Sequence, residues 1–275
     1  MNPTLKKELS VAACKIRIGA IEAVHAAKSG HPGGSLSAAD ILAYLYFNEM
    51  NIDPADPEKA DRDKFVLSKG HAAPALYAAL AEKGFFPKEE LLNLRKIGCI
   101  LQGHPDKKKI PGVDMSTRSL GQGISVATGM ALANKMDGNP GRIYSVLGDG
   151  ELQEGLVWEA AMAASHHGLD NFTIFVDWNG LQIDGKNEDV ITVTPIDEKF
   201  ASFGWDVTVI DGHDFEEIAA AVEKAKKTEG KPQAIIAKTV KGKGVSFMED
   251  QAGWHGKAPN DEQAKQAVEE LGGEW

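Results

Sequence analysis

Apolar side chains recur at helical spacing near the start of the chain and form short continuous runs further on. From about Thr4 to Lys28 they recur every three or four positions, which predicts a helix that ends before the glycine-rich segment 29–34. Further helices are expected at about 37–49, 72–83, 153–167 and 215–227. Short apolar runs typical of buried strands lie at 64–68, 142–147, 171–176, 205–210 and 233–239.

The alternation of these strands and helices predicts an α/β fold. Because the strands are apolar throughout, we expect a doubly wound, mostly parallel sheet with helices on both faces. No repeat or flexible linker divides the chain, so residues 1–275 are expected to form a single domain. Residues 260–275 are expected to be a C-terminal tail with a short helix capped by Asn260 or Asp261.

Composition excludes several classes of function. The chain has 30 Lys and Arg against 40 Asp and Glu, a net charge of −10, so a nucleic acid partner is not expected. The basic run 107–109 is interpreted as a solvated loop without chemistry. Cys14 and Cys99 are too few for a disulfide scaffold, which favours a reducing cytoplasm. No apolar run reaches the roughly 18 residues that a membrane span needs, and the N-terminus lacks the apolar core of a signal peptide.

Two polar loops follow neighbouring strand candidates. Gly148-Asp149-Gly150 ends the run at 142–147, and Asp177-Trp178-Asn179 ends the run at 171–176. In an open parallel sheet both loops lie at the carboxyl edge, where ligands bind. Glycines and a following helix N-terminus suit a phosphate group, and the oxygens of Asp149 and Asn179 suit Mg²⁺ or Ca²⁺. Gly-Asp-Gly alone is also ordinary turn chemistry, so the strand–helix–strand context carries the argument.

Here the chain resembles the transketolases, in a set of motifs that runs from about Ala23 to Gly256. The thiamine diphosphate motif is matched by Gly148-Asp149-Gly150-Glu151-Leu152-Gln153-Glu154-Gly155 and by Asp177 to Gly185. Other segments follow in the order of the family: Ser29 to Gly33, Leu67 to Ala72, Gly103 to Pro105, Ser119 to Gly123 and Trp254 to Gly256. The resemblance implies the thiamine diphosphate-binding fold, in its diphosphate-binding (PP-type) form.

The resemblance also implies a role for each matched residue. Asp149, Asn179 and the backbone carbonyl of Leu181 would bind the metal. The residues implied to bind the cofactor are His71, Leu120, Gly148, Asp149, Gly150, Glu154, Asn179 and His255. Leu120 matches a stretch that lines the aminopyrimidine, and Glu154 matches a residue of an interface carboxylate network that activates the cofactor.

Four of the eight histidines lie in segments that resemble the family. Of these, His31, His104 and His255 are implied to be catalytic together with Glu154, because the matching residues surround the sugar carbonyl and hydroxyls. His104 resembles the histidine near the terminal hydroxyl of the donor. The others, His25, His166, His167 and His213, are interpreted as surface or packing residues.

The resemblance covers the first half of a transketolase only. In the family, the activating glutamate, the aromatic residues that stack on the pyrimidine and most ligands of the acceptor phosphate follow the matched segment. We therefore expect a C-terminal transketolase subunit, the pyrimidine-binding half, as partner in an α2β2 assembly. The pair would transfer a two-carbon ketol unit from a ketose phosphate to an aldose phosphate, and this chain would be inactive alone.

Three alternatives remain open from the residues. The chain could belong to a related thiamine diphosphate enzyme, similar to 1-deoxyxylulose-5-phosphate synthase or to a transketolase for another sugar. It could also be a non-catalytic cofactor-binding subunit, although the intact Asp149, Asn179 and Glu154 argue against decay. A dinucleotide-binding fold ranks low, because no Gly-x-Gly-x-x-Gly follows the first strand candidate. One departure from the family is Arg118, where transketolases usually have glycine.

Overall fold

The computed structural model describes residues 1–275 and is built around a five-stranded sheet in which every pair of neighbours is parallel. The strand order is β1-β2-β3-β7-β6. The strands are β1 (Lys64–Leu67), β2 (Ile143–Gly148), β3 (Phe172–Trp178), β6 (Asp206–Asp211) and β7 (Gln233–Lys238). Gly148, at the end of β2, pairs with Asp177 of β3, so the two polar loops leave the sheet side by side. The predicted doubly wound fold is confirmed.

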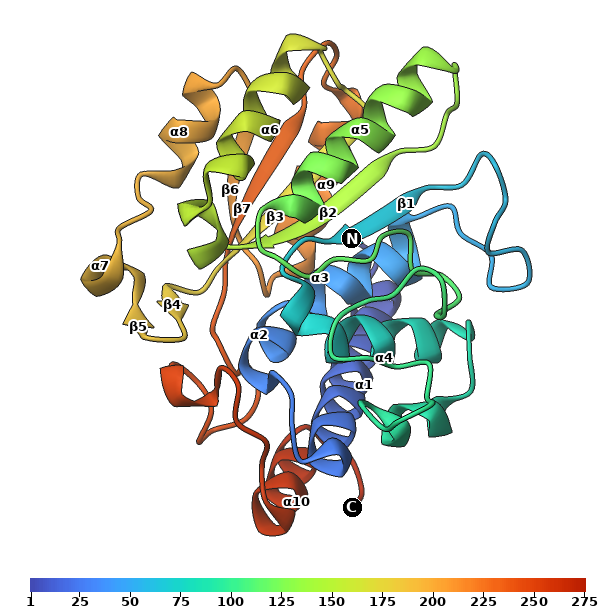
Figure 1. Ribbon diagram of the computed structural model, residues 1–275, viewed down its shortest axis with the longest axis vertical. Helices are drawn as coiled ribbons and strands as arrows, with labels where there is room; N and C mark the ends of the chain where they lie inside the picture. The colour runs from blue at the N-terminus through green and yellow to red at the C-terminus, as the bar shows by residue number, and fades with distance from the viewer.

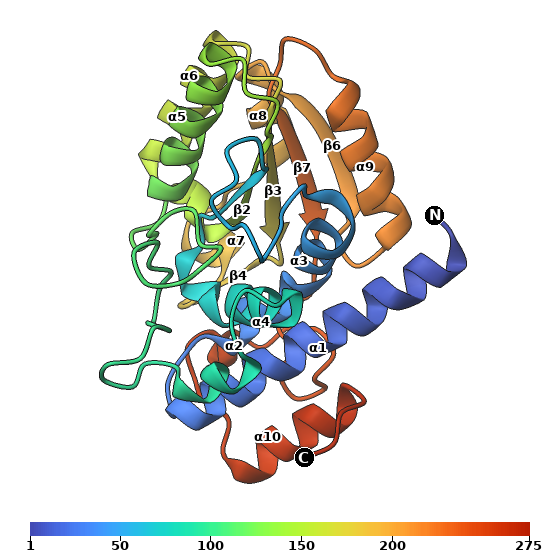
Figure 2. The same cartoon turned by 90° about the vertical axis from the view of Figure 1, so that its right-hand side faces the viewer.

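Helices cover both faces of the sheet, as Figures 1 and 2 show. One face carries α5 (Gln122–Met136), α6 (Gly155–His166) and α8 (Ile196–Ser202), and the other carries α3 (Ala39–Tyr44) and α9 (Phe215–Lys227). Helices α1 (Pro3–Ala27) and α4 (Ala73–Lys83) pack together and against α3, and they extend the same core away from the sheet. Alternate side chains of each strand feed the two cores. Phe65 and Leu67 join the core under α1 and α4, whereas Val66 joins the core under α5 and α6.

The structure corrects the predicted helix at 37–49. Helix starts earlier, at Pro32, and is divided into α2 (Pro32–Ser37), α3 and a π-helical turn (Leu45–Glu49). Pro32 occupies the first turn, where its missing N–H costs nothing. Gly33 allows a close approach, because a Cβ there would lie 3.0 Å from the carbonyl oxygen of Trp254. The non-helical segment between α1 and α2 is therefore shorter than the glycine-rich segment 29–34 predicted.

The helix predicted at 153–167 also starts later than expected. A 3₁₀ turn (Gly150–Gln153) follows β2, and α6 begins only at Gly155. The cause is Glu151, whose carboxylate turns back and accepts the backbone N–H of Gly148 at 3.0 Å. The N–H groups near Gly150 thus belong to a short turn and not to a long helix, which weakens the predicted helix-dipole contribution at that position.

Several elements were not predicted. They are α5, the hairpin of β4 (Leu181–Gln182) and β5 (Gly185–Lys186), α7 (Asn187–Val190), α8, and the 3₁₀ segments Gly70–Ala72, Lys88–Asn93 and Ala252–Trp254. The expectation that all strands are buried on both faces fails for β6 only. Edge strand β6 leaves Val209 42% exposed. None of these differences changes the sheet order or the position of the two loops.

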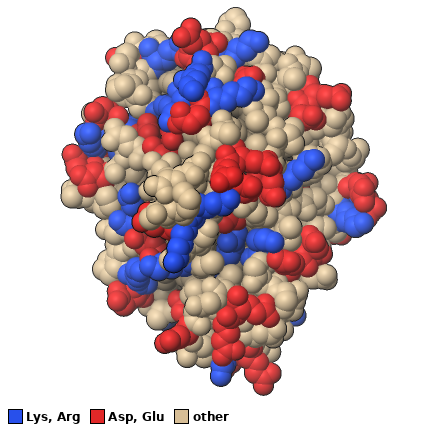
Figure 3. All heavy atoms as spheres, turned by 180° about the vertical axis from the view of Figure 1, so that it is seen from behind, with Lys and Arg blue, Asp and Glu red and all other residues tan.

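The C-terminal tail forms the predicted capped helix. Helix α10 (Asp261–Glu270) begins after Asn260, whose side chain accepts the N–H of Gln263 while Gln263 bonds back to Asn260. Val268 of α10 packs in a small core with Ile21 of α1. No helix combines the length and the apolar character that a membrane crossing demands. On the face in Figure 3, basic and acidic side chains lie interspersed in small groups.

Candidate active site

A pocket of about 350 Å³ opens where the strands end. It lies at the carboxyl edge of the sheet, the usual ligand position in such folds. Every residue predicted from the sequence to bind the cofactor, hold the metal or take part in catalysis lines it: His31, His71, His104, Leu120, Gly148, Asp149, Gly150, Glu154, Asn179, Leu181 and His255. The structure thus gathers in one cavity residues that are up to 224 positions apart, from His31 to His255.

The two loops meet through the side chain of Asp149. One carboxylate oxygen accepts the N–H of Gly150 at 2.8 Å, and the other accepts the N–H of Gly180 at 2.5 Å. Gly180 has φ +76°, a backbone conformation that favours glycine. Asn179 accepts the N–H of Leu181 through its side-chain oxygen at 3.1 Å. These hydrogen bonds hold Asp149, in the loop after β2, next to Asn179 and Leu181, in the turn after β3.

Lys241 is a pocket residue that the sequence reasoning missed. Its ammonium group donates to the backbone carbonyl of Leu181 at 3.2 Å, and its side chain is buried. Burial, followed by the charge of Lys69, lowers the pKa of Lys241 to about 8. A cation therefore already lies at the carbonyl that the resemblance implied as a metal ligand. No motif pointed to Lys241, because it follows the last strand in a segment rich in lysine and glycine.

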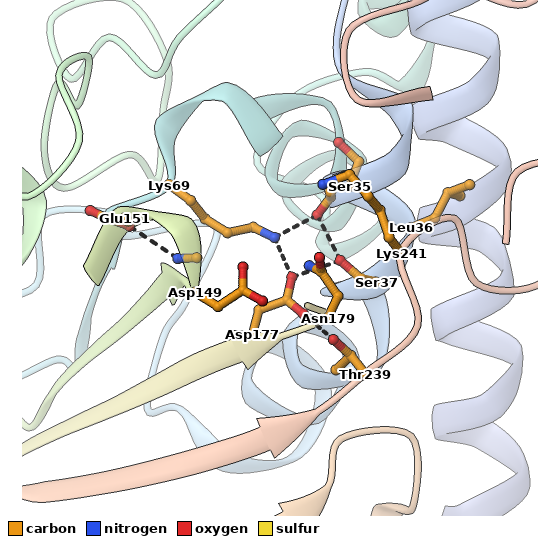
Figure 4. A network of polar contacts seen from close by, with 12 residues as sticks. Ser35, Leu36, Ser37, Lys69, Asp149, Glu151, Asp177, Asn179, Thr239 and Lys241 are labelled. Atoms are coloured by element: carbon orange, nitrogen blue, oxygen red, sulfur yellow. Dashed lines mark hydrogen bonds and ion pairs between the residues drawn. The ribbon is translucent and has the colours of Figure 1, made fainter. Parts of the chain in front are cut away.

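A buried ion pair lies beneath the loops, as Figure 4 shows. The ammonium group of Lys69 binds the carboxylate of Asp177 and the carbonyl of Gly34, the latter at 2.7 Å. Ser37 and Thr239 donate their hydroxyl groups to the same carboxylate. Burial alone would raise the pKa of Asp177, but Lys69 holds it below its usual value. Because the pair is fully hydrogen-bonded, it joins α2, β3 and β7 into one rigid floor.

The pKa of Asp149 is shifted in the opposite direction to that of Asp177. Burial, and next the negative charge of Asp177, raise the pKa of Asp149 to about 6. Of these two neighbouring buried carboxylates, only Asp177 forms an ion pair with a cation. A carboxylate whose ionised form is disfavoured by its surroundings gains from an added positive charge. This arrangement suits a bound cation at Asp149.

Glu151 anchors the opposite wall of the pocket. Its buried carboxylate accepts the hydroxyl of Ser68 at 2.5 Å and the N–H of Gly121 at 2.8 Å. Gly121 caps the start of α5, and the neighbouring Leu120 lines the pocket. Glu151 thus fixes the segment that the resemblance assigned to the aminopyrimidine. Three residues further on, the side chain of Glu154 is exposed at the pocket and forms no hydrogen bond or ion pair within the chain.

Three histidines form a cluster over the floor. The ring centroids of His71 and His255 are 5.0 Å apart, and His31 lies 5.3 Å from His71 and 5.5 Å from His255. The Nδ1 atoms of His31 and His255 are buried without a partner. Burial is the main reason why the pKa of His31 falls to about 4 and that of His255 to about 3. Both imidazoles are therefore neutral at pH 7.

The low pKa values of His31 and His255 give a testable pH dependence. A histidine with a folded pKa below its unfolded value of about 6.5 disfavours protonation in the folded state, so chain stability should fall as pH decreases from about 6.5 towards 4. In an NMR titration of the free chain, we expect both rings to titrate below pH 5. Spectra of His31→Asn and His255→Asn assign the resonances, and a midpoint near 6.5 for either ring would contradict this electrostatic picture.

The four histidines interpreted as surface or packing residues lie outside the pocket. His166 and His167 are exposed at the end of α6, and His25 contacts Asp261 at 2.8 Å. His213 makes two specific hydrogen-bond contacts. Its Nδ1 lies 2.7 Å from a carboxylate oxygen of Asp40, and its Nε2 accepts the N–H of Val240 at 2.9 Å. His213 therefore fixes the backbone next to Lys241.

The two loops after β2 and β3 offer oxygen atoms that could hold a metal ion. No group of three or more His, Cys, Asp or Glu side chains is arranged to hold a metal ion. The turn instead offers one carboxylate, one amide oxygen and one backbone carbonyl, from Asp149, Asn179 and Leu181. These are hard oxygen ligands of the kind that Mg²⁺ takes alongside phosphate oxygens and water. The residues therefore fit a cation that arrives together with a phosphate group.

Comparison with known proteins identifies the class to which this site belongs. A family model described as "Transketolase, thiamine diphosphate binding domain" matches residues 9–274. The transketolase of Campylobacter jejuni has a solved structure that matches with a TM-score of 0.92 at 36% identity, over 100% of this chain and 44% of that one. The fold is that of a thiamine diphosphate-binding domain.

The chain belongs to the transketolase family. It is 50% identical over 242 residues to the 6-deoxy-6-sulfo-D-fructose transketolase subunit SqwG of Clostridium sp. (strain MSTE9), covering 88% of each chain. It is 43% identical to an apulose-4-phosphate transketolase subunit from Phocaeicola vulgatus, covering 91% of this chain and 89% of that one. Human transketolase is 45% identical over 261 residues, but the chain spans only 41% of its length.

Proposed function

We propose that this chain is the N-terminal, cofactor-binding subunit of a two-chain transketolase. Together with a C-terminal partner it transfers a two-carbon ketol unit from a ketose phosphate to an aldose phosphate. The observation that carries the proposal is the single pocket in which the loop turn of Asp149 and Asn179 faces the cluster of His31, His71 and His255. The division into two chains is supported by relatives that are named as subunits and are matched over 88% and 89% of their own length.

In this proposal, Asp149, Asn179 and the carbonyl of Leu181 hold Mg²⁺, or Ca²⁺ in its place, and the metal binds the diphosphate of thiamine diphosphate. The cofactor supplies the carbanion that cleaves and forms the carbon–carbon bond. Lys241 would have to move off the carbonyl of Leu181 for a metal to be held there, and its ammonium group would then be available to the diphosphate. The Lys69–Asp177 pair supports this exchange by keeping the floor rigid.

The neutral histidines would act on the sugar and on the diphosphate. His71, the most buried of the cluster and with a pKa well below its usual value because of burial, suits a neutral hydrogen bond to the diphosphate. His31 and His255 line the pocket as neutral imidazoles, which suits proton transfer at the acceptor carbonyl. His104, on a separate segment of the pocket wall, would bind the terminal hydroxyl of the donor.

The partner chain would complete the site. Glu154 is exposed at the pocket without any side-chain partner in this chain, as expected for a carboxylate that joins an interface network. We propose an α2β2 assembly, because sites of this kind lie between domains of different protomers and closed symmetry is the rule for such assemblies. Both cysteines are free thiols, which supports a reducing, cytoplasmic setting.

The decisive experiment mixes the chain with its candidate partner, the product of a neighbouring reading frame that carries the pyrimidine-binding half. With thiamine diphosphate and Mg²⁺, the pair is expected to convert xylulose 5-phosphate plus ribose 5-phosphate, and each chain alone should be at least roughly 100-fold less active. Pyruvate plus glyceraldehyde 3-phosphate serves as the comparison, because turnover of that pair alone would assign a 1-deoxyxylulose-5-phosphate synthase-like reaction. Cofactor binding without any turnover would favour a non-catalytic subunit.

A further inference from the structure

Arg118 lines the pocket at a position where the family usually has glycine. In this chain the change places no strain on the backbone. Only Lys28, Arg95 and Asp250 among the non-glycine residues have a positive φ, so residue 118 does not need a glycine conformation. The arginine therefore leaves the loop geometry intact, and what position 118 adds is a long cationic side chain.

The backbone on both sides of Arg118 is fixed in place. On one side, the hydroxyl of Ser116 accepts the N–H of Lys107 at 3.0 Å, and Thr117 is buried. On the other side, the N–H of Gly121 is held by Glu151 at 2.8 Å. The side chain of Arg118 is exposed between these anchors and faces the pocket. A fixed backbone with a free guanidinium group is suited to binding a ligand, because little backbone entropy is lost.

The positive charge of Arg118 is not neutralised within the chain. Its side chain makes no hydrogen bond, and no carboxylate lies within 4.0 Å, although Glu154 and Asp184 line the same pocket. A second guanidinium group, that of Arg95, does not line the pocket but lies behind it, next to Gly103. Arg95 donates to Ser29 at 2.7 Å, lacks an ion pair, and has a buried Nε without a partner. After burial, the charges of Arg95 and Arg118 are what lower the pKa of His104.

We propose that Arg118, reinforced by the charge of Arg95, forms a subsite for a tetrahedral oxyanion, either phosphate or sulfonate, carried by the sugar substrate. The inference rests on the proposed function and adds a determinant of substrate class to it. A guanidinium fork binds two oxygens of such a group at once, which a glycine at this position cannot do. The exposed lysines 107–109, whose loop is tied to Ser116, add long-range attraction for the anion.

The test compares charged and neutral donors of one carbon skeleton in the assembled, cofactor-loaded complex. Arg118→Gln is expected to raise the KM for xylulose 5-phosphate by roughly 10-fold or more, with kcat, the KM for unphosphorylated xylulose and thiamine diphosphate affinity changed by less than about 2-fold. Arg118→Lys should recover part of the loss, and Arg118→Gly should behave like Arg118→Gln. Lys231→Gln, which removes an exposed charge before β7, is the matched control.

Sulfonate and phosphate are distinguished by measuring a donor that ends in sulfonate beside its phosphate counterpart. The donor whose KM rises more with Arg118→Gln carries the preferred anion. Equal effects on xylulose and xylulose 5-phosphate would overturn the proposal. So would weaker association with the partner at unchanged KM, because Arg118 would then pair with a carboxylate of that chain. If the parent complex turned over no sugar, the proposed function would fail by itself. Binding of methyl phosphate to the loaded complex, lost or unchanged in Arg118→Gln, would then decide the subsite alone.

Discussion

Asp149→Asn is expected to weaken the binding of thiamine diphosphate with Mg²⁺ by roughly 10- to 100-fold, because the exchange removes the only ionised ligand of the turn. An amide also presents an NH₂ group to one of the two N–H donors, Gly150 and Gly180, that the carboxylate accepts. Isothermal titration of the complex with the cofactor at fixed Mg²⁺ measures the effect. Asp197→Asn, an exposed change on α8, is the control.

The stability of Asp149→Asn adds a second check. The folded pKa of Asp149, about 6, lies above its unfolded value of about 3.9, so ionisation of Asp149 costs the fold stability as pH rises from about 4 to 6. Removal of the charge is favourable and loss of one accepted N–H is unfavourable, so the melting temperature of the cofactor-free chain at pH 7 should change little. If Asp149→Asn binds the cofactor more weakly while the chain stays folded, Asp149 acts in binding. Unchanged affinity would count against Asp149 as a metal ligand, and so would a loss of affinity explained by a lower melting temperature.

Glu154→Gln is expected to lower kcat of the assembled enzyme by roughly 100- to 1,000-fold while it leaves the isolated chain unchanged. Because Glu154 is exposed and its side chain has no partner within this chain, its replacement should alter the free energy of unfolding by less than about 0.5 kcal/mol. The two results together separate an interface role from a folding role. Steady-state kinetics with the partner and thermal unfolding without it provide the measurements.

The matched control for Glu154→Gln is Glu159→Gln, which removes an exposed carboxylate from the next turn of α6. This control should keep kcat within about 2-fold, as is usual for surface changes without partners. If Glu154→Gln kept its activity as well, the proposed carboxylate network between the two chains would be wrong.

Much of the fold could be predicted because each inner strand is short, apolar and bounded by clear turn residues. Strands such as 171–176 and helices such as 215–227 carry their pattern locally, and the structure places them within two residues of the prediction. Helix α5 was missed because its burial depends on contacts made elsewhere: a Cβ at Gly123 would lie 2.5 Å from the Cα of Ser68. No local periodicity reveals such a contact.

Some residues of the candidate site could be predicted from the sequence and others could not, for a similar reason. Asp149 and Asn179 follow strands, so the edge of the sheet brings them together by topology alone. Lys241 and the pair of Lys69 with Asp177 act through burial, which the sequence does not reveal for a charged residue. The backbone contact of His213 with Val240 likewise depends on how β6 and β7 are placed.

The most direct test is a crystal structure of the assembled complex grown with thiamine diphosphate and Mn²⁺ in place of Mg²⁺, because anomalous scattering locates Mn²⁺ without ambiguity. We predict one metal peak per cofactor, bonded to Asp149, Asn179, the carbonyl of Leu181 and the diphosphate, with Lys241 moved off that carbonyl. A cofactor bound elsewhere, or a metal absent from the turn while Lys241 still holds Leu181, would contradict the account.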